Sequence, residues 1–216
     1  MQALFITVEG GEGVGKSVFI RGLSQALLAQ GISLMLTREP GGTPLADEIR
    51  QLFLHPPNDD KPSPIAELFL VSAARAQHVA MRIQPWLASG QWVLCDRFYD
   101  STRVYQGSLG GVAANILESV LSYSVAGCHP HLSFLLDCST EIAMQRIEMR
   151  ELAQGHALAA RNRYDAGSRE MHQCLRVAYQ DLAKRFAERM VVIDAEASPE
   201  AMVSVALQQI ERWRRR

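Results

Sequence analysis

Five short segments of the chain are apolar at almost every position. They occupy Leu4–Glu9, Ser33–Arg38, Trp92–Asp96, Leu132–Asp137 and Met190–Asp194. Strands that are apolar throughout are typical of a parallel sheet that is covered on both faces. The longer segments between them place apolar residues three or four positions apart, which predicts helices. The pattern therefore predicts an α/β fold with a five-stranded parallel sheet and helices on both faces.

Several of the predicted helices have clear start and stop signals. Serine and proline favour the first turn of a helix, and glycine favours the position just past its end. On this basis we expect helices from Ser17 to Gly31, from Pro44 to about His55, from about Ser63 to Ala88, and from Ser198 onward.

One segment interrupts this alternation of strands and helices. It runs from about Arg150 to Gly167 and is rich in Arg, Ala and Gln. We expect one domain over residues 1–216, with a lid inserted at about 146–167.

The composition is that of an ordinary soluble protein. The 216 residues are 48% hydrophobic and 21% charged, with a net charge of -1, which predicts no general affinity for nucleic acid or for an anionic membrane. The sequence contains four cysteines but no C-x-x-C motif, and no apolar run approaches the ~18 residues that span a membrane. We expect reduced thiols and a cytoplasmic location.

A glycine-rich loop follows the first predicted strand and precedes the first predicted helix. It reads Gly10-x-x-x-x-Gly15-Lys16-Ser17, which is the full phosphate-binding pattern in its proper context. The backbone N–H groups of such a loop surround phosphates, the lysine reaches the β- and γ-phosphates, and the hydroxyl binds Mg²⁺. The loop alone leaves hydrolysis, transfer and sensing open, although the absence of N-K-x-D counts against a GTPase.

Further cations point to the meeting of two phosphorylated substrates. Arg97 follows Asp96 at the end of the third strand, Arg38 ends the second strand, and more arginines lie in the expected lid. Phosphoryl transfer depends mainly on positioning and on neutralising charge. Several cations around one phosphate cluster therefore favour a transferase.

Taken together, these motifs resemble bacterial thymidylate kinases, which belong to the P-loop nucleoside monophosphate kinases. The stretches that carry the resemblance, in chain order, are F-I-T-V-E-G-G-E-G-V-G-K-S, T-R-E-P-G-G-T, A-A-R-A-Q-H, D-R-F-Y-D-S-T and Y-Q-G. The resemblance extends over essentially the whole chain. It implies transfer of the γ-phosphoryl of ATP to dTMP, with Mg²⁺ as cofactor, and a homodimer.

The resemblance also implies roles for individual residues. It places the ATP phosphates on Gly10, Gly11, Glu12, Gly13, Val14, Gly15, Lys16 and Ser17, and Mg²⁺ near Ser17, Asp96 and Glu12. It gives catalytic roles to Lys16, Glu12, Asp96 and Arg97, and to an arginine of the lid. Arg150 is the first choice for this arginine, Arg161 and Arg163 follow closely, and Arg146 also lies in or beside the segment. It places dTMP against Arg38, Arg75, Arg97, Ser101, Tyr105 and Gln106, with the ring of Tyr105 against the deoxyribose.

The chain departs from the family pattern at the base site. The phenylalanine that stacks on thymine in the family would fall on Val71 or Ser72, and Phe69 is the nearest aromatic residue. We therefore take Phe69 as the candidate replacement. Two alternatives stay open: a kinase of another nucleoside monophosphate, and a catalytically impaired nucleotide-binding paralogue.

Overall fold

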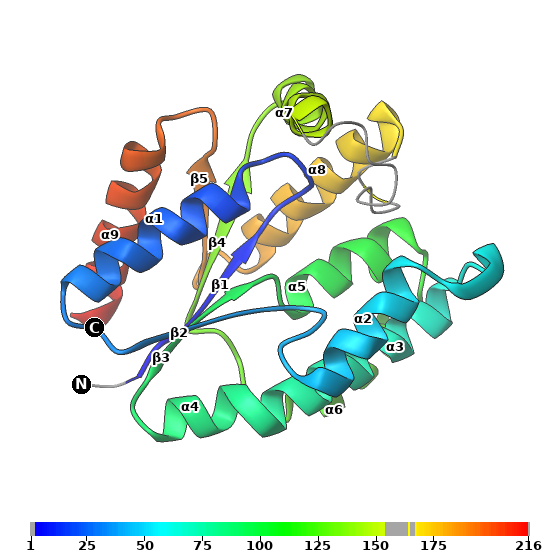
Figure 1. Cartoon of the computed structure of the whole chain (residues 1–216), viewed down its shortest axis with the longest axis horizontal. Helices are drawn as coiled ribbons and strands as arrows, with labels where there is room; N and C mark the ends of the chain where they lie inside the picture. The colour runs from blue at the N-terminus through cyan, green and yellow to red at the C-terminus, as the bar shows by residue number, and fades with distance from the viewer. Residues whose placement is uncertain (1–2, 154–163, 165–166, 216) are drawn as a thin grey trace.

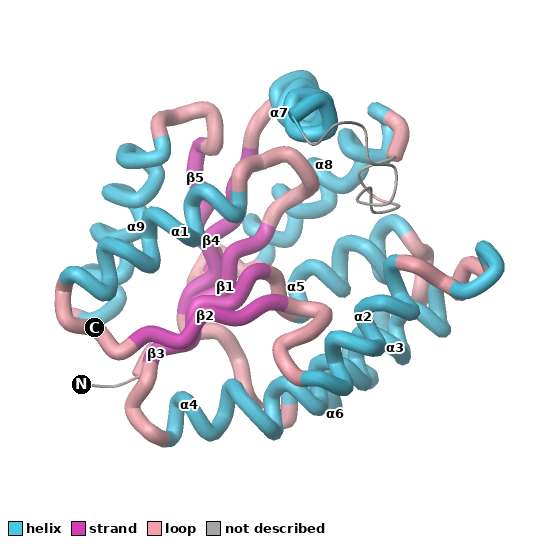
Figure 2. The backbone as a smooth tube through the Cα atoms, in the orientation of Figure 1, coloured by secondary structure: helices cyan, strands magenta, loops and turns pink. Residues whose placement is uncertain are grey.

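The structure is a computed structural model that describes residues 3–153, 164 and 167–215. A single five-stranded sheet lies at its centre (Figures 1 and 2). The strands are β1 Phe5–Glu9, β2 Leu34–Arg38, β3 Trp92–Asp96, β4 Leu132–Asp137 and β5 Met190–Asp194. They run in the order β2-β3-β1-β4-β5, and each neighbouring pair is parallel. The predicted fold class and all five predicted strands are confirmed, each within one residue at its ends.

Helices cover both faces of this sheet. They are α1 Lys16–Ala29, α2 Pro44–Leu54, α3 Pro64–His78, α4 Gln84–Ala88, α5 Tyr99–Thr102, α6 Ala114–Val125, α7 Thr140–Ala153, α8 Arg169–Arg185 and α9 Pro199–Arg214. Figures 1 and 2 show α1 and α9 on one side of the sheet and α4 and α6 on the other. None of the described helices is long and apolar enough to cross a membrane.

The central strand β1 supplies side chains to both hydrophobic layers. Ile6 and Val8 pack with α1 and α9, whereas Phe5 packs with α3, α4 and α6 on the opposite side. Alternate residues of a strand point to opposite faces of the sheet, so an apolar β1 can fill both layers.

The predicted long helix over 63–88 is present but is interrupted. A π-helical turn, η2 Val79–Ile83, separates α3 from α4. Pro85 lies at the start of α4 and has no backbone N–H to donate to the preceding turn. The wider π-helical turn accommodates this missing hydrogen bond.

A second π-helical turn, η3 Arg103–Leu109, continues directly from α5. It contains two of the predicted substrate residues, Tyr105 and Gln106, and both are buried. The segment after β3 therefore consists of an α-helical turn followed by a wider π-helical turn, and the second turn carries the predicted substrate residues.

The strand order fixes where a ligand can bind. The chain leaves β1 toward β2 at one edge of the sheet, and it leaves β3 toward β4 on the other side of β1. Helix α1, which follows β1, and helix α6, which follows β3, pack in opposite layers. The loops after these two neighbouring strands therefore lead to opposite faces of the sheet, and a crevice opens at their carboxyl ends. Val8 lies opposite Asp96 in the register, so the glycine loop and the Asp96-Arg97 pair emerge side by side.

Candidate active site

The glycine loop between β1 and α1 has the backbone conformation of a phosphate cradle. Gly10, Gly13 and Gly15 have φ values of 136°, 76° and 95°, which side chains other than hydrogen rarely allow. At Gly10, a Cβ atom would lie 2.6 Å from the carbonyl oxygen of Leu136. Helix α1 begins at Lys16, and the residue before it, Gly15, has no side chain to cap the helix. Its first N–H groups are therefore available to an anion.

Two cations from separate parts of the chain converge on one oxygen of this loop. Lys16 Nζ donates to the carbonyl oxygen of Gly10 at 3.1 Å, and Arg97 Nη1 donates to the same oxygen at 2.8 Å. Lys16 also donates to the carbonyl of Gly11 at 2.6 Å. Burial lowers the pKa of Lys16, and the charge of Arg97 lowers it further, whereas Glu12 opposes the shift.

Glu12 balances the charge of these two cations. Its carboxylate accepts from Arg97 at 2.8 Å and from the Tyr105 hydroxyl at 3.1 Å, and it lies 3.9 Å from Lys16. Burial alone would raise the pKa of Glu12, but Arg97 and Lys16 outweigh burial and lower this pKa to about 2. Glu12 is therefore ionised at neutral pH, inside a cluster of cations.

Arg97 is held in a strained backbone conformation. Its φ is 69°, in the left-handed region. The N–H of Arg97 donates to the carbonyl of Val8 at 2.9 Å, and the next N–H, that of Phe98, donates to the Glu9 carboxylate at 2.8 Å. These bonds fix the turn after β3 and aim the guanidinium of Arg97 at the glycine loop.

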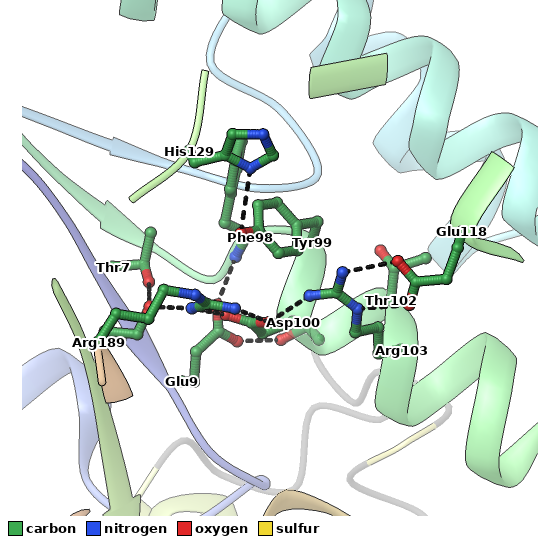
Figure 3. Close-up of polar contacts among 12 residues, drawn as sticks. Thr7, Glu9, Phe98, Tyr99, Asp100, Thr102, Arg103, Glu118, His129 and Arg189 are labelled. Atoms are coloured by element: carbon green, nitrogen blue, oxygen red, sulfur yellow. Dashed lines mark hydrogen bonds and ion pairs between the residues drawn. The ribbon is translucent and has the colours of Figure 1, made fainter. Parts of the chain in front are cut away.

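An ionic cluster around Asp100 anchors the turn after β3. Asp100 is fully buried and lies between two guanidinium groups, those of Arg103 at 3.0 Å and Arg189 at 2.7 Å (Figure 3). Arg103 also binds Glu118 on α6, and Arg189 directly precedes β5. The buried charge of Asp100 is thereby compensated, and α5 is tied to two distant elements.

One carboxylate oxygen of Asp96 stands out among the described residues. Its Oδ1 is buried and makes no hydrogen bond within the described part of the chain. Asp96 also lines the cavity described below. A buried carboxylate oxygen that lacks a donor is suited to bind a cation or its water shell.

Arg75 on α3 presents a second buried polar atom that has no partner among the described residues. Its Nε donates to Glu39 at 2.7 Å and its Nη2 donates to Thr102 at 2.8 Å, but Nη1 makes no hydrogen bond to the described residues. His78 contacts the other oxygen of Glu39 at 3.0 Å. The guanidinium is thus held rigidly, with one N–H group left for a ligand.

A cavity of about 610 Å³ brings the predicted residues together. Its size is typical of small-molecule sites. Of the residues predicted from the sequence, it is lined by Glu12, Gly13, Val14, Gly15, Lys16, Ser17, Arg38, Arg75, Asp96, Arg97, Ser101, Tyr105, Gln106, Arg146 and Arg150. Gly10 and Gly11 do not line the cavity, and their carbonyls accept hydrogen bonds from Lys16.

Two of the four arginines expected in or beside the lid belong to the described residues. Arg146 and Arg150 belong to α7 and line the cavity. Arg146 donates to the carbonyls of Val14 at 3.4 Å and of Ala195 at 2.9 Å. Arg161 and Arg163, with most of the expected lid, lie outside the described residues.

Phe69 requires a correction, because it does not line the cavity. Its side chain is 55% exposed. On α3, the residues that face inward include Val71, Ala74, Arg75 and His78. Two helical positions separate Phe69 from Val71, which turns Phe69 by roughly 200° to the outside. Val71 itself lines the cavity, so α3 offers no aromatic ring there.

Sequence reasoning missed several residues of the site. Arg50, Phe53 and Leu54 on α2 line the cavity, as does Tyr164. No sequence pattern indicates a role for Tyr179 on α8, yet its hydroxyl accepts a hydrogen bond from Arg97 Nη1 at 3.0 Å. The spacing of Arg50, Phe53 and Leu54, at i, i+3 and i+4, places them on one face of a helix. This spacing could have predicted that the three residues face the same side of α2.

Comparisons with known proteins agree with this geometry. The family model described as thymidylate kinase matches residues 8–205. The thymidylate kinase of Caulobacter vibrioides is 41% identical over 203 residues, covering 94% of this chain and 93% of that protein. The thymidylate kinase of Chromohalobacter salexigens is 42% identical over 209 residues, covering 96% and 95%.

A solved structure shows the same fold. The crystal structure of thymidylate kinase from Ehrlichia chaffeensis superposes with a TM-score of 0.75 at 25% identity, covering 97% of this chain and 100% of that one. The glycine loop, the motif after β3 and the matches over nearly the full length lead to one conclusion. This chain belongs to the thymidylate kinase family.

Proposed function

We propose how the residues of this cavity carry out the reaction of the family, in which the γ-phosphoryl of ATP is transferred to dTMP, giving dTDP and ADP. The observation that carries the assignment is the convergence of Lys16 and Arg97 on the carbonyl oxygen of Gly10. Lys16 belongs to the cradle for the donor, and Arg97 follows a different strand. A phosphoryl group placed between the two substrates would meet both cations.

The donor phosphates bind along the glycine loop and the start of α1. The uncapped N–H groups of α1 and the ammonium of Lys16 neutralise their charge. In this role Lys16 exchanges the carbonyls of Gly10 and Gly11 for phosphate oxygens.

The phosphate of dTMP binds on the opposite side of the transferred group. Arg38, Arg50 and Arg97 line this part of the cavity. An oxygen of this phosphate attacks the γ-phosphorus of ATP while the bond to the oxygen bridging the β- and γ-phosphates breaks, and ADP leaves. The cations act by positioning the two groups in line and by stabilising charge on the transferred phosphoryl.

The base of dTMP lies near Arg75 and Gln106. The Nη1 group of Arg75, which makes no hydrogen bond to the described residues, is suited to a carbonyl oxygen at the edge of a pyrimidine. Tyr105 is buried between this region and the glycine loop, where its ring stands against the sugar.

The residues present fit a magnesium ion. Ser17 and Asp96 line the cavity, and Asp96 Oδ1 is buried without a hydrogen-bond donor in the described chain. No group of three His, Cys, Asp or Glu residues forms a metal site among the described residues. Mg²⁺ commonly takes one or two protein oxygens and completes its shell with phosphate oxygens and water. When bound, the ion supplies charge neutralisation at the β- and γ-phosphates.

Two broader assignments belong to this proposal. A homodimer in which α3 contributes to the interface is supported by the exposed side chains of Ile65 and Phe69 on that helix, with exposed fractions of 39% and 55%. A cytoplasmic location is supported by the four cysteines, all of which are free thiols.

The decisive test combines a substrate panel with a variant of Lys16. ADP release from ATP is measured with dTMP, dUMP, UMP, CMP, GMP and AMP in turn. We expect dTMP to have the highest kcat/KM, and Lys16→Ala to lower kcat with dTMP by at least ~100-fold. The control is Lys61→Ala, because Lys61 is exposed in the loop before α3.

The possible failures are distinct. A higher kcat/KM for another monophosphate would identify a different nucleoside monophosphate kinase. The absence of ADP release with every monophosphate would indicate an impaired paralogue. Near-normal kcat in Lys16→Ala would refute the role given to the glycine loop.

A further inference from the structure

One end of the cavity is walled by apolar and aromatic side chains. Phe53 and Leu54 come from α2, Val71 comes from α3, and Tyr164 comes from the segment before α8. Phe53 is nearly buried, with 5% of its side chain exposed. Val71 lies one helical turn before Arg75 on α3, and both line the cavity.

Three aromatic rings form a continuous series at this end. The ring centroids of Phe53 and Tyr164 are 6.2 Å apart with 34° between the planes, and those of Tyr164 and Tyr105 are 4.7 Å apart with 76° between the planes. Both separations are within the range of direct aromatic contact. Phe53, Tyr164 and Tyr105 therefore act as one wall, which we call the aromatic wall.

Polar contacts fix the middle ring of this wall. The hydroxyl of Tyr164 donates to Glu67 at 3.4 Å, and Gln106 donates to the same carboxylate oxygen at 3.0 Å. Gln106 follows Tyr105 directly in η3. The aromatic wall and the polar groups beside it are thus joined through Glu67.

Helix α2 runs from the cations toward this wall. Arg50 lies in the cavity close enough to Arg38 and Arg97 for their charges to lower its pKa, after burial as the main cause. Phe53 follows three positions later on the same helix face, which is about 4.5 Å farther along the axis. A nucleotide whose phosphate lies at Arg50 would therefore carry its sugar and base in the direction of Phe53.

A planar base needs a flat apolar surface for its face and polar atoms for its edge. Arg75 and Gln106 supply the polar atoms. On α3, Val71 supplies no ring, and Phe69 is turned to the outside. Among the described residues, the aromatic side chains that line the cavity are Phe53, Phe98, Tyr105 and Tyr164. Phe98 is covered by the guanidinium of Arg75 at 5.3 Å.

We propose that Phe53, supported by Tyr164, is the stacking surface for the base of the acceptor nucleotide and determines its affinity in this chain. The proposal rests on the proposed function, because it takes the acceptor base to lie beside Arg75. In this chain the aromatic surface for the base thus belongs to α2, because α3 presents Val71 to the cavity and supplies no ring there.

The test replaces the ring while keeping an apolar side chain. In Phe53→Leu, we expect the KM for dTMP to rise about tenfold, in the range of ~1–3 kcal/mol for one base on an aromatic ring. The KM for ATP and kcat should stay within about twofold. Binding of thymidine, measured by calorimetry, should weaken by the same factor, because the nucleoside has no phosphate for the cations to hold.

The matched control is Tyr123→Leu, which also removes an aromatic ring but at an exposed position of α6 outside the cavity, and it should leave every constant unchanged. A second variant, Phe53→Leu with Val71→Phe, places a ring on the α3 side of the cavity and should recover most of the lost affinity for thymidine. If Phe53→Leu is less stable in thermal unfolding, Phe53→Met replaces it in both experiments.

The outcomes separate this inference from the proposed function. If wild-type protein does not phosphorylate dTMP, the proposed function fails. If wild-type protein phosphorylates dTMP and the variants of Phe53 keep its KM and the thymidine affinity within about twofold, the stacking role of Phe53 is wrong. Equal losses of dTMP and ATP affinity would also overturn it, since they would indicate a general distortion of the cavity.

Discussion

The guanidinium of Arg97 lies 2.8 Å from the carboxylate of Glu12, so the cation after the third strand is paired with an acid of the glycine loop. The two residues are 85 positions apart in the sequence. Their pairing joins the glycine loop to the turn after β3, and it keeps Arg97 and Lys16 together despite their like charge.

Glu12→Gln should therefore lower kcat at least tenfold. The amide keeps the shape of the side chain but removes the charge that holds Arg97 in place. We expect the KM values for ATP and dTMP to fall or stay constant, because a negative charge near their phosphates is lost. Steady-state kinetics checks this expectation. The control is Glu48→Gln, which makes the same change at an exposed position of α2. A kcat within twofold of wild type would show that the pair has no part in turnover.

Tyr105→Ala should relax the preference for deoxyribose. With the ring of Tyr105 against the sugar, as proposed, a 2′-hydroxyl would have little room. Removal of this buried ring should therefore favour the ribonucleotide more than the deoxyribonucleotide. We expect the ratio of kcat/KM for dTMP to that for ribothymidylate to fall about tenfold. Tyr105→Phe is the control, because it keeps the ring and removes only the hydroxyl bonded to Glu12. An unchanged ratio in Tyr105→Ala would place the ring away from the sugar.

Arg150→Ala should lower kcat by tenfold or more with little change in the KM for dTMP. Arg150 lies in the last turn of α7 and lines the cavity. A cation that stabilises charge only in the transition state affects kcat and leaves substrate binding largely intact. Arg82→Ala, at an exposed position, is the control. Should Arg150→Ala retain kcat within threefold, the transition-state cation must be another residue.

Glu9 should make the stability of the protein depend on pH. Burial, and then the charge of Asp100, raise the pKa of Glu9 from 4.5 to about 8, although Ser101, Arg97 and the N–H of Phe98 oppose the shift. Between these values the folded state keeps a proton that the unfolded state has lost. The contribution of Glu9 to stability therefore falls as pH rises through this window, by up to about 1.4 kcal/mol per pH unit.

Urea unfolding at pH 5, 6, 7 and 8 measures this effect. The free energy of unfolding should decrease more steeply with pH in wild type than in Glu9→Gln, which cannot ionise. Glu188→Gln, at an exposed position, should follow wild type. Parallel curves for wild type and Glu9→Gln would mean that Glu9 is ionised throughout the window.

The strands and the cradle could be predicted from the sequence because their signals are local. Apolar runs marked β1 to β5, and the glycine spacing marked the loop. Helix α6 was not assigned, although Leu117, Leu121 and Val125 recur every four residues and are buried. The pairing of Arg97 with Glu12 and the contact between Tyr179 and Arg97 could not be predicted, because each joins residues that are far apart in the sequence. Phe69 was wrongly assigned to the base site because it is the aromatic residue nearest to Val71 in the sequence, although its position along the helix turns it to the outside.

The π-helical turn η3 has a consequence for how such a site can change during evolution. A π-helical turn is an α-helical turn that holds one residue more, so a single-codon insertion can create it and a single-codon deletion can remove it. Loss of one residue before Tyr105 would rotate the preceding helix against Tyr105 and Gln106 by about 100°. Gains or losses of single codons could thus redirect the side chains of the acceptor site, a route that point substitutions do not offer.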